Sequence, residues 1–220
     1  MFGEMTLLKE LDLSSFNTSK VTDMGLMFYN CQSLTTINLS SFDTSRVTSN
    51  HRMFDGCKNL KNLDLSNFDT NLITSYSYMF NSCRSLTSIN FGDKYQRKVE
   101  YMDNMFNGCS SLISLDLTLF DTSKLLFADG AFNGCSSLVN IKMDNFDTSK
   151  VSSLISMFRY CSSLTSLYLP KFETIHLDVK KLATMFEGCD NLKLSLYPDK
   201  CLNLIPTLPQ YVQLINLTSY

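Results

Sequence analysis

Residues 105–112 read Met-Phe-Asn-Gly-Cys-Ser-Ser-Leu, and near copies of this string recur at a fixed interval along the 220-residue chain. The cysteine of the string recurs at Cys31, Cys57, Cys83, Cys109, Cys135, Cys161, Cys189 and Cys201. Successive differences are 26 five times, then 28, then 12. This spacing predicts one structural unit repeated along the chain. It fits neither paired zinc ligands nor the irregular cysteines of a small disulfide scaffold.

Two rows of phenylalanine keep the same period. The first row precedes the cysteines by three residues and comprises Phe28, Phe54, Phe80, Phe106, Phe132, Phe158 and Phe186. The second row comprises Phe16, Phe42, Phe68, Phe120, Phe146 and Phe172, with Lys94 where another Phe is due. A unit this short cannot enclose such side chains alone, so the units must stack and bury a continuous core. We expect the chain around Lys94 to bulge outward, with Tyr95 in place of the missing Phe, because burying an unpaired lysine is costly.

Each unit begins with a short strand. Residues 34–39 read Leu-Thr-Thr-Ile-Asn-Leu, the L-x-x-L-x-L form of a leucine-rich-repeat strand with one buried face. The apolar spacing of Met24, Met27, Phe28 and Cys31 favours a short helical segment, ended in other units by a glycine C-cap such as Gly134. The sequence therefore predicts an α/β solenoid, a leucine-rich repeat with one short parallel β-strand and a short helix or 3-10 turn per 26-residue repeat.

The repeats are expected to form one domain with a single parallel sheet. Eight strand starts can be counted, at Leu8, Leu34, Leu60, Leu86, Leu112, Leu138, Leu164 and Leu192. We predict a leucine-rich-repeat array over residues 1–192 that starts in mid-repeat, because Met1-Phe2 aligns with the Met-Phe of the string. Residues 193–220 contain three prolines and are predicted to form a C-terminal cap. The chain is then expected to be a fragment, or a mature domain cut from a longer array.

Two strings support a resemblance to a known family. Residues 11–24 read Leu-Asp-Leu-Ser-Ser-Phe-Asn-Thr-Ser-Lys-Val-Thr-Asp-Met, and residues 105–112 carry the Met-Phe-x-x-Cys-x-Ser-Leu form. Together they resemble the BspA-like leucine-rich repeats of bacterial and protozoan surface proteins, which include a lipoprotein-associated group in mycoplasmas and lactobacilli. The resemblance covers residues 1 to about 192. It implies a secreted or surface-anchored protein with an adhesion or host-interaction role, and it brings no catalytic residues.

Charge and composition argue against several functional classes. The formal net charge of −2 offers no excess of Lys and Arg for nucleic acid, and no apolar run approaches the ~18 residues of a membrane span. The two histidines, His51 and His176, have no periodic cysteine partner that would make a nucleophilic pair. We therefore expect neither an enzyme nor a cofactor. We also expect the laddered cysteines to be reduced and buried as small apolar side chains, and His51 to be exposed.

A periodic row of carboxylates leaves one alternative open. It comprises Asp43, Asp69, Asp121, Asp147 and Glu173. Stacked carboxylates are compatible with a calcium ladder, because hard cations bind carboxylate oxygens. One carboxylate per repeat is too few for a six-to-eight-oxygen shell, so we favour Asx turns, in which each Asp accepts local backbone N–H groups.

The exposed face of the sheet is the expected ligand surface. The residues between the strand leucines are mostly small and polar, but the C-terminal units offer Ile113, Leu119, Val139, Lys142 and Tyr168. Exposed aliphatics beside an aromatic and a cation are typical of protein-binding hot spots, although strand propensity alone also accounts for Ile113 and Val139. We predict a non-enzymatic protein-binding or adhesion module, extracellular or at the cell surface. The alternative is an intracellular or structural repeat scaffold without host contact. The pattern specifies no oligomeric state.

Overall fold

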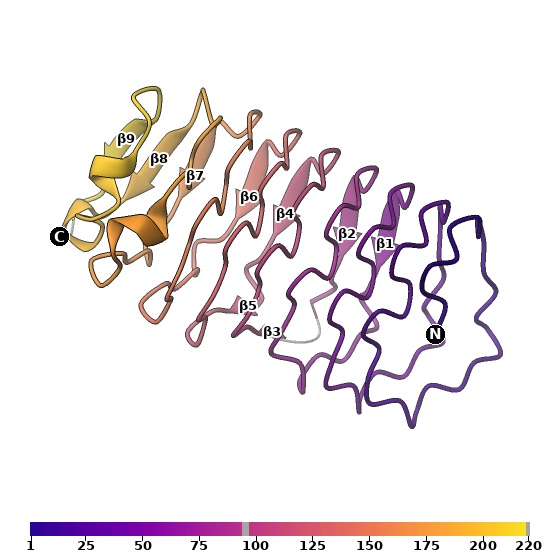
Figure 1. Cartoon of the computed structure of the whole chain (residues 1–220). Helices are drawn as coiled ribbons and strands as arrows, with labels where there is room; N and C mark the ends of the chain where they lie inside the picture. The colour runs from indigo at the N-terminus through magenta and orange to yellow at the C-terminus, as the bar shows by residue number, and fades with distance from the viewer. Residues whose placement is uncertain (94–96, 219–220) are drawn as a thin grey trace.

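The protein is an elongated parallel β-solenoid. The computed structural model describes residues 1–93 and 97–218, and its chain winds in successive rungs from the N-terminus at one end to the C-terminus at the other (Figure 1). This confirms the stacked architecture that the 26-residue period predicts. The reason is that each rung covers the apolar side chains of its neighbours, which no rung can bury alone.

In residues 1–93 and 97–218, seven short strands lie along one side of the stack. They are β1 Asn62–Asp64, β2 Ser88–Asn90, β4 Ser114–Asp116, β6 Asn140–Lys142, β7 Ser166–Tyr168, β8 Lys193–Leu196 and β9 Gln213–Asn216. A second parallel pair joins β3 (Arg97–Lys98) to β5 (Phe120–Asp121) at another corner of the rungs. The described part of the chain also has three 3-10 helices in the last rungs: η1 Val179–Leu182, η2 Pro198–Lys200 and η3 Ile205–Thr207.

The strands are hydrogen-bonded in groups rather than as the expected single sheet. The groups are β1-β2, β4-β6 and β7-β8-β9, all parallel. The segments that begin at Leu8 and Leu34 are not regular strands, although Thr35 N–H donates to the Lys9 carbonyl at 3.3 Å. Parallel pairing continues past residue 192 to Asn216. The division between array and cap at residue 192 stays a prediction.

The Met-Phe segment of each rung forms turns, and the expected helix is not confirmed. Its N–H groups donate alternately within the segment and to the next rung. Met27 donates to the Met24 carbonyl at 3.2 Å, whereas Phe28 donates to the Met53 carbonyl of the next rung at 2.9 Å. A helix would keep both bonds within the segment. Leu26 also has a φ of 58°, a left-handed conformation that interrupts helical backbone. The turns thus add a second line of hydrogen bonds between rungs.

The first phenylalanine row forms a continuous stack through the core. Consecutive rings from Phe2 to Phe186 lie nearly parallel, with centroids 5.1 to 5.9 Å apart. From Phe28 onward these side chains are at most 1% exposed. Each buried ring contributes about 1.5–3 kcal/mol of transfer free energy. The row therefore joins each rung to the next from Phe2 to Phe186.

An arginine occupies the gap in the second phenylalanine row. Arg97 is in parallel register with Phe120 and is 1% exposed. Its guanidinium carbon lies 5.2 Å from the Phe91 ring centroid and 5.6 Å from the Phe120 centroid, and the group donates to the Phe91 carbonyl. Burial lowers the pKa of this guanidinium. The expectations for Lys94 and Tyr95 fall outside the described residues.

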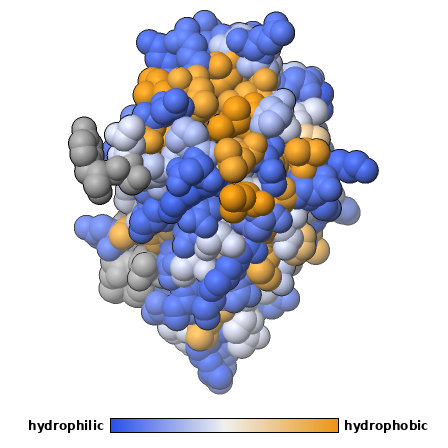
Figure 2. Space-filling model, turned by 90° about the vertical axis from the view of Figure 1, so that its left-hand side faces the viewer, coloured by the Kyte–Doolittle hydropathy of each residue, from blue (hydrophilic) through white to orange (hydrophobic). Residues whose placement is uncertain are grey.

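Apolar side chains gather on the C-terminal end of the stack, onto which Figure 2 looks. Leu202 and Ile215 are 55% and 46% exposed there. Among the described residues β9 has a strand neighbour on one side only, which is β8.

Candidate binding face

The outward row of Ile113 and Val139 is built by the strand pattern. Leu112, Leu115 and Leu117 point into the core, so the residues between them face solvent. Ile113 and Val139 lie on adjacent rungs, where Val139 N–H donates to the Ile113 carbonyl at 2.9 Å. Their side chains are 54% and 48% exposed. The structure therefore brings these two predicted residues together as one aliphatic strip.

Lys142 and Tyr168 extend this face over the next rungs. Tyr168 ends β7 and is 48% exposed. Lys142 pairs with Asp116 across β4 and β6, with Nζ 3.3 Å from Oδ2, and both side chains are more than half exposed. Such an exposed pair contributes roughly 0–1 kcal/mol. The pair could have been predicted, because a 26-residue period puts Asp116 and Lys142 on successive rungs of one row.

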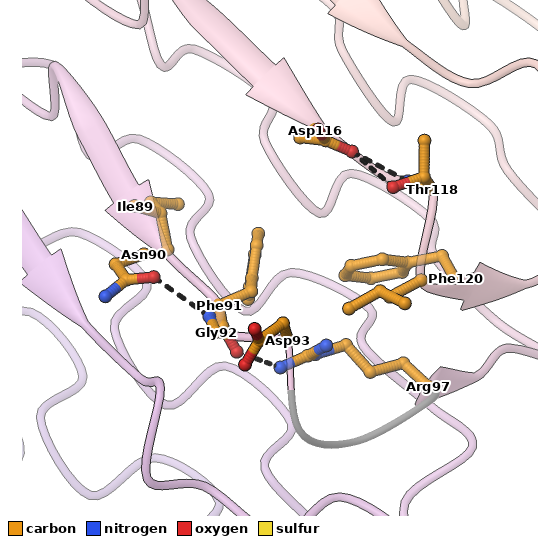
Figure 3. Close-up of a pocket in the computed structure, with 10 residues that line it drawn as sticks. Ile89, Asn90, Phe91, Gly92, Asp93, Arg97, Asp116, Thr118 and Phe120 are labelled. Atoms are coloured by element: carbon orange, nitrogen blue, oxygen red, sulfur yellow. Dashed lines mark hydrogen bonds between the residues drawn. The ribbon is translucent and has the colours of Figure 1, made fainter.

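Leu119, unlike the other four predicted residues, lines a cleft. The cleft has a volume of about 370 Å³ and opens between the ends of β2 and β4 (Figure 3). Asp116 and Thr118 line one wall, and Phe91 and Arg97 line another. Asp116 already accepts from the Thr118 N–H at 3.0 Å and from its hydroxyl at 2.6 Å. The polar groups of the cleft thus mainly hold their own turns, and Leu119 is half-buried.

Comparison with known proteins identifies the family. The sequence model of the family DUF285, described as a Mycoplasma protein of unknown function, matches residues 1–114 and 100–201. The chain belongs to the DUF285 family. This match shows a repeat family related to the expected one, while the finer BspA-like assignment stays a prediction.

The chain was also compared with solved structures and with curated proteins, and one solved structure is similar to it. The structure is that of a leucine-rich cell surface protein from Faecalibacterium prausnitzii A2-165, which is 16% identical to the DUF285 chain. The match covers 97% of this chain and 84% of that one, with a TM-score of 0.26. No curated protein matches the sequence.

The four aspartates of the carboxylate row of the DUF285 chain form the expected Asx turns, whereas the Glu173 carboxylate accepts from Lys200 Nζ at 2.9 Å. Asp43 accepts from Ser45 N–H at 3.0 Å, and Asp69, Asp121 and Asp147 accept in the same way from the residue two places on. The hydroxyl and N–H of Ser45 lower the pKa of the Asp43 carboxyl. Within residues 1–93 and 97–218, no three Asp, Glu, His or Cys side chains gather as a metal would require. The Asx interpretation therefore accounts for Asp43, Asp69, Asp121 and Asp147.

The eight cysteines of the DUF285 chain are all buried, as expected, and are unbonded to one another. Each thiol lies beside a Phe carbonyl of the rung before, as where Cys57 Sγ donates to the Phe28 oxygen at 3.1 Å. Burial raises the pKa of Cys135 and of Cys189 to about 12. A thiol held in its neutral form is a poor nucleophile and metal ligand.

Among the described residues, the two histidines make no hydrogen bond to a cysteine. His51 is exposed, as expected, and its ring meets Tyr78 edge to face at 6.0 Å. His176 Nε2 lies 2.8 Å from the Val151 carbonyl. In the part of the DUF285 chain that the structure describes, no helix is long and apolar enough to cross a bilayer.

Proposed function

We propose that the chain is a non-enzymatic protein-binding or adhesion module of a secreted or cell-surface protein, and that its ligand binds the exposed sheet face of residues 112–172. The observation that supports this is the exposed aliphatic strip of Ile113 and Val139. The same outward row elsewhere contains Lys9, Thr35, Lys61, Thr87 and Thr165. Core rows must repeat because each side chain packs on its equivalents, whereas an exposed row is free to change where a ligand selects it.

The chemistry of the strip suits a protein ligand. An aliphatic surface gains free energy when a partner removes it from water. Tyr168 adds a half-exposed ring with a hydroxyl, and Lys142 adds a cation that a partner can reach from solvent. Aromatic and aliphatic anchors with polar neighbours are what binding hot spots combine. Leu119 is assigned to the edge of this surface, where the cleft begins.

The alternative is an intracellular or structural scaffold, and it predicts a different cellular location from that of a surface module. Intact cells of the source organism can be treated briefly with trypsin and the released peptides identified by mass spectrometry. A surface module is expected to release peptides from this chain before cytoplasmic markers appear. Digestion of this chain only after cell lysis would favour the intracellular scaffold.

The binding face is tested with adhesion of chain-coated beads to cultured host cells. Lys142→Ala combined with Tyr168→Ala is expected to weaken adhesion at least about tenfold, as loss of one or more hot spots does. The matched control is Asp12→Asn with Asp64→Asn. It changes the other end of the face while keeping its turns, since Asn38 and Asn90 already form the same turns. If the control loses adhesion and the double alanine variant keeps it, the assignment of the site is wrong.

A further inference from the structure

The last strand of the sheet, β9, has an open edge. The N–H groups of Gln213 and Leu217 donate to carbonyls of the rung before, at 2.8 and 2.9 Å. Peptide groups of successive residues point to opposite edges of a strand, so the N–H and C=O groups of Leu214 and Asn216 point away from β8. Among the described residues no strand pairs with that edge. Such a row of backbone groups is a template for a strand of another chain.

Charged side chains do not protect this edge. Soluble proteins commonly guard an exposed edge strand with charges, especially Lys, or with proline. Charged residues make up 18% of the chain, yet residues 201–220 contain no Asp, Glu, Lys, Arg or His, and β9 contains no proline. Apolar side chains instead gather on this end of the stack (Figure 2). The end therefore resembles a surface that a partner covers rather than one that repels other chains.

The edge is complementary to a second copy of itself. A twofold contact brings the same surface of both copies together, so the surface must match itself. The two β9 strands then run antiparallel, and with the axis beside Ile215 the Leu214 of each copy lies opposite Asn216 of the other. Both residues have outward N–H and C=O groups, so the two pairs exchange four backbone hydrogen bonds. Residues 201–220 bring no like charges together, because they contain none.

Ile215 is central in this register. It faces its own copy as a non-hydrogen-bonded pair, in which the Cα atoms are about 4.5 Å apart and the side chains are closest. Its side chain is 46% exposed in the single chain, and the pairing removes it from water. We propose that the chain forms a twofold dimer through its C-terminal end, in which β9 pairs antiparallel with β9 of a second copy. The sheet β7-β8-β9 then continues across the axis.

Sedimentation of the whole chain at micromolar concentration tests the dimer. The wild-type chain is expected at twice its own mass. Ile215→Lys is expected to give a monomer, because two ammonium groups would meet at the axis. The matched control is Ile113→Lys, which puts the same charge on the same sheet face at a residue that is 54% exposed but lies far along the chain from β9. This control should remain a dimer.

Added cysteines test the register. All eight native cysteines are buried, so mild oxidation acts on an added surface thiol. Ile215→Cys is expected to crosslink to its own copy, since Cα atoms about 4.5 Å apart are within disulfide range. Gln213→Cys is the matched control on the same strand and face. In this register it lies four residues from its own copy, roughly 14 Å along the strand, and should stay uncrosslinked.

A wild-type chain that sediments as a monomer overturns the proposal, and so does a dimer that Ile215→Lys leaves intact. Crosslinking of Gln213→Cys without that of Ile215→Cys would show a different contact. Masses beyond the dimer would indicate that this end stacks on the N-terminal end of the next copy, which also contradicts the twofold pairing. The wild-type mass and the cysteine variants decide the matter even where Ile215→Lys fails to fold.

Discussion

The buried thiols make the stability of the protein sensitive to alkaline pH. In the unfolded chain their pKa is near the ordinary 9.0, whereas burial raises that of Cys135 to about 12 and of Cys201 to about 11. Below about pH 9 both states keep the proton, and the stabilisation by burial is fully present. Above it the unfolded state loses protons first, so stability falls as pH rises towards the folded pKa values.

We expect each such thiol to lower the free energy of unfolding by about 1.4 kcal/mol per pH unit in that window. Urea unfolding at pH 7.5, 9 and 10 measures the slope. A variant with Cys83→Ala, Cys109→Ala and Cys135→Ala shares every Lys and Tyr with the wild type and should show a shallower slope. Equal slopes would contradict the prediction.

Left-handed residues recur at two positions of the turn. At the second of these positions glycine and other residues alternate. Gly108 and Gly134 have a φ of 73°, and Ser82 has 59° in the same row. The Asn-Gly steps in the sequence predicted positive φ at these glycines. The same conformation at Ser82 carries no glycine to reveal it, and only the period, applied to the backbone as well as to side chains, could have predicted it.

Gly134→Ala is therefore expected to lower the free energy of unfolding by about 1–2 kcal/mol, the cost of left-handed backbone for a residue with Cβ. Space is not the cause, because the added Cβ would lie 3.6 Å from the Gly108 Cα, an ordinary contact. Ser82→Ala is the control: this position already bears that cost, so little change is expected. Thermal unfolding compares the two, and an equal loss in both variants would refute the backbone explanation.

At the scale of elements, apolar spacing predicted the strand faces correctly but not the form of the turn. Met24, Met27, Phe28 and Cys31 lie on one side of either a helix or a run of turns, so their spacing fits both. The deciding factor is the partner of each N–H group, and Phe28 N–H finds the next rung rather than its own segment. A pattern along one chain segment contains no information on that partner. The same limit hid Arg97, because counting by 26 puts Lys94 at the phenylalanine corner.

Hydrogen bonds between rung corners can be tested at Thr148. Its hydroxyl donates to the Glu173 carbonyl and accepts from the Glu173 N–H, both at 2.7 Å. Thr148→Val leaves two buried backbone groups of the next rung without this partner. We expect a loss of about 1–3 kcal/mol in urea unfolding. Thr148→Ser keeps the hydroxyl and should lose less than half as much. A serine variant as unstable as the valine variant would show that packing, not hydrogen bonding, dominates.

For the whole molecule, the period alone predicted the solenoid, the two phenylalanine rows and the burial of the cysteines. Of the five residues predicted for the candidate face, four are exposed: Ile113, Val139, Lys142 and Tyr168. The fifth, Leu119, is half-buried. The cleft that Phe91 and Arg97 line could not be predicted. It depends on how one irregular repeat departs from the period, and a period describes only what the repeats share.

A solenoid is stabilised by contacts between neighbouring rungs. Whether the array unfolds as a whole or in parts therefore depends on which of these contacts continue along its full length. The sheet is divided between β2 and β4 as well as between β6 and β7, and Arg97 interrupts the second phenylalanine row near the first division. At that division the Phe80 and Phe106 rings still stack at 5.3 Å, and the Phe80 N–H still donates to the Met105 carbonyl at 2.9 Å. Phe106→Ala should therefore cost about 3–5 kcal/mol, as burial of a large ring predicts. It should also uncouple the rungs on its two sides.

Hydrogen exchange of the native protein, followed by peptide mass spectrometry, measures this uncoupling. In Phe106→Ala we expect one half of the array to exchange at lower denaturant concentration than the other, with the boundary near residue 106. Phe172→Ala is the control, since that ring is as fully buried but lies near the C-terminal rungs. Its faster exchange should be confined to those rungs. If both variants speed exchange uniformly from end to end, the array unfolds as one cooperative unit and the Phe80–Phe106 stack is not what couples its halves.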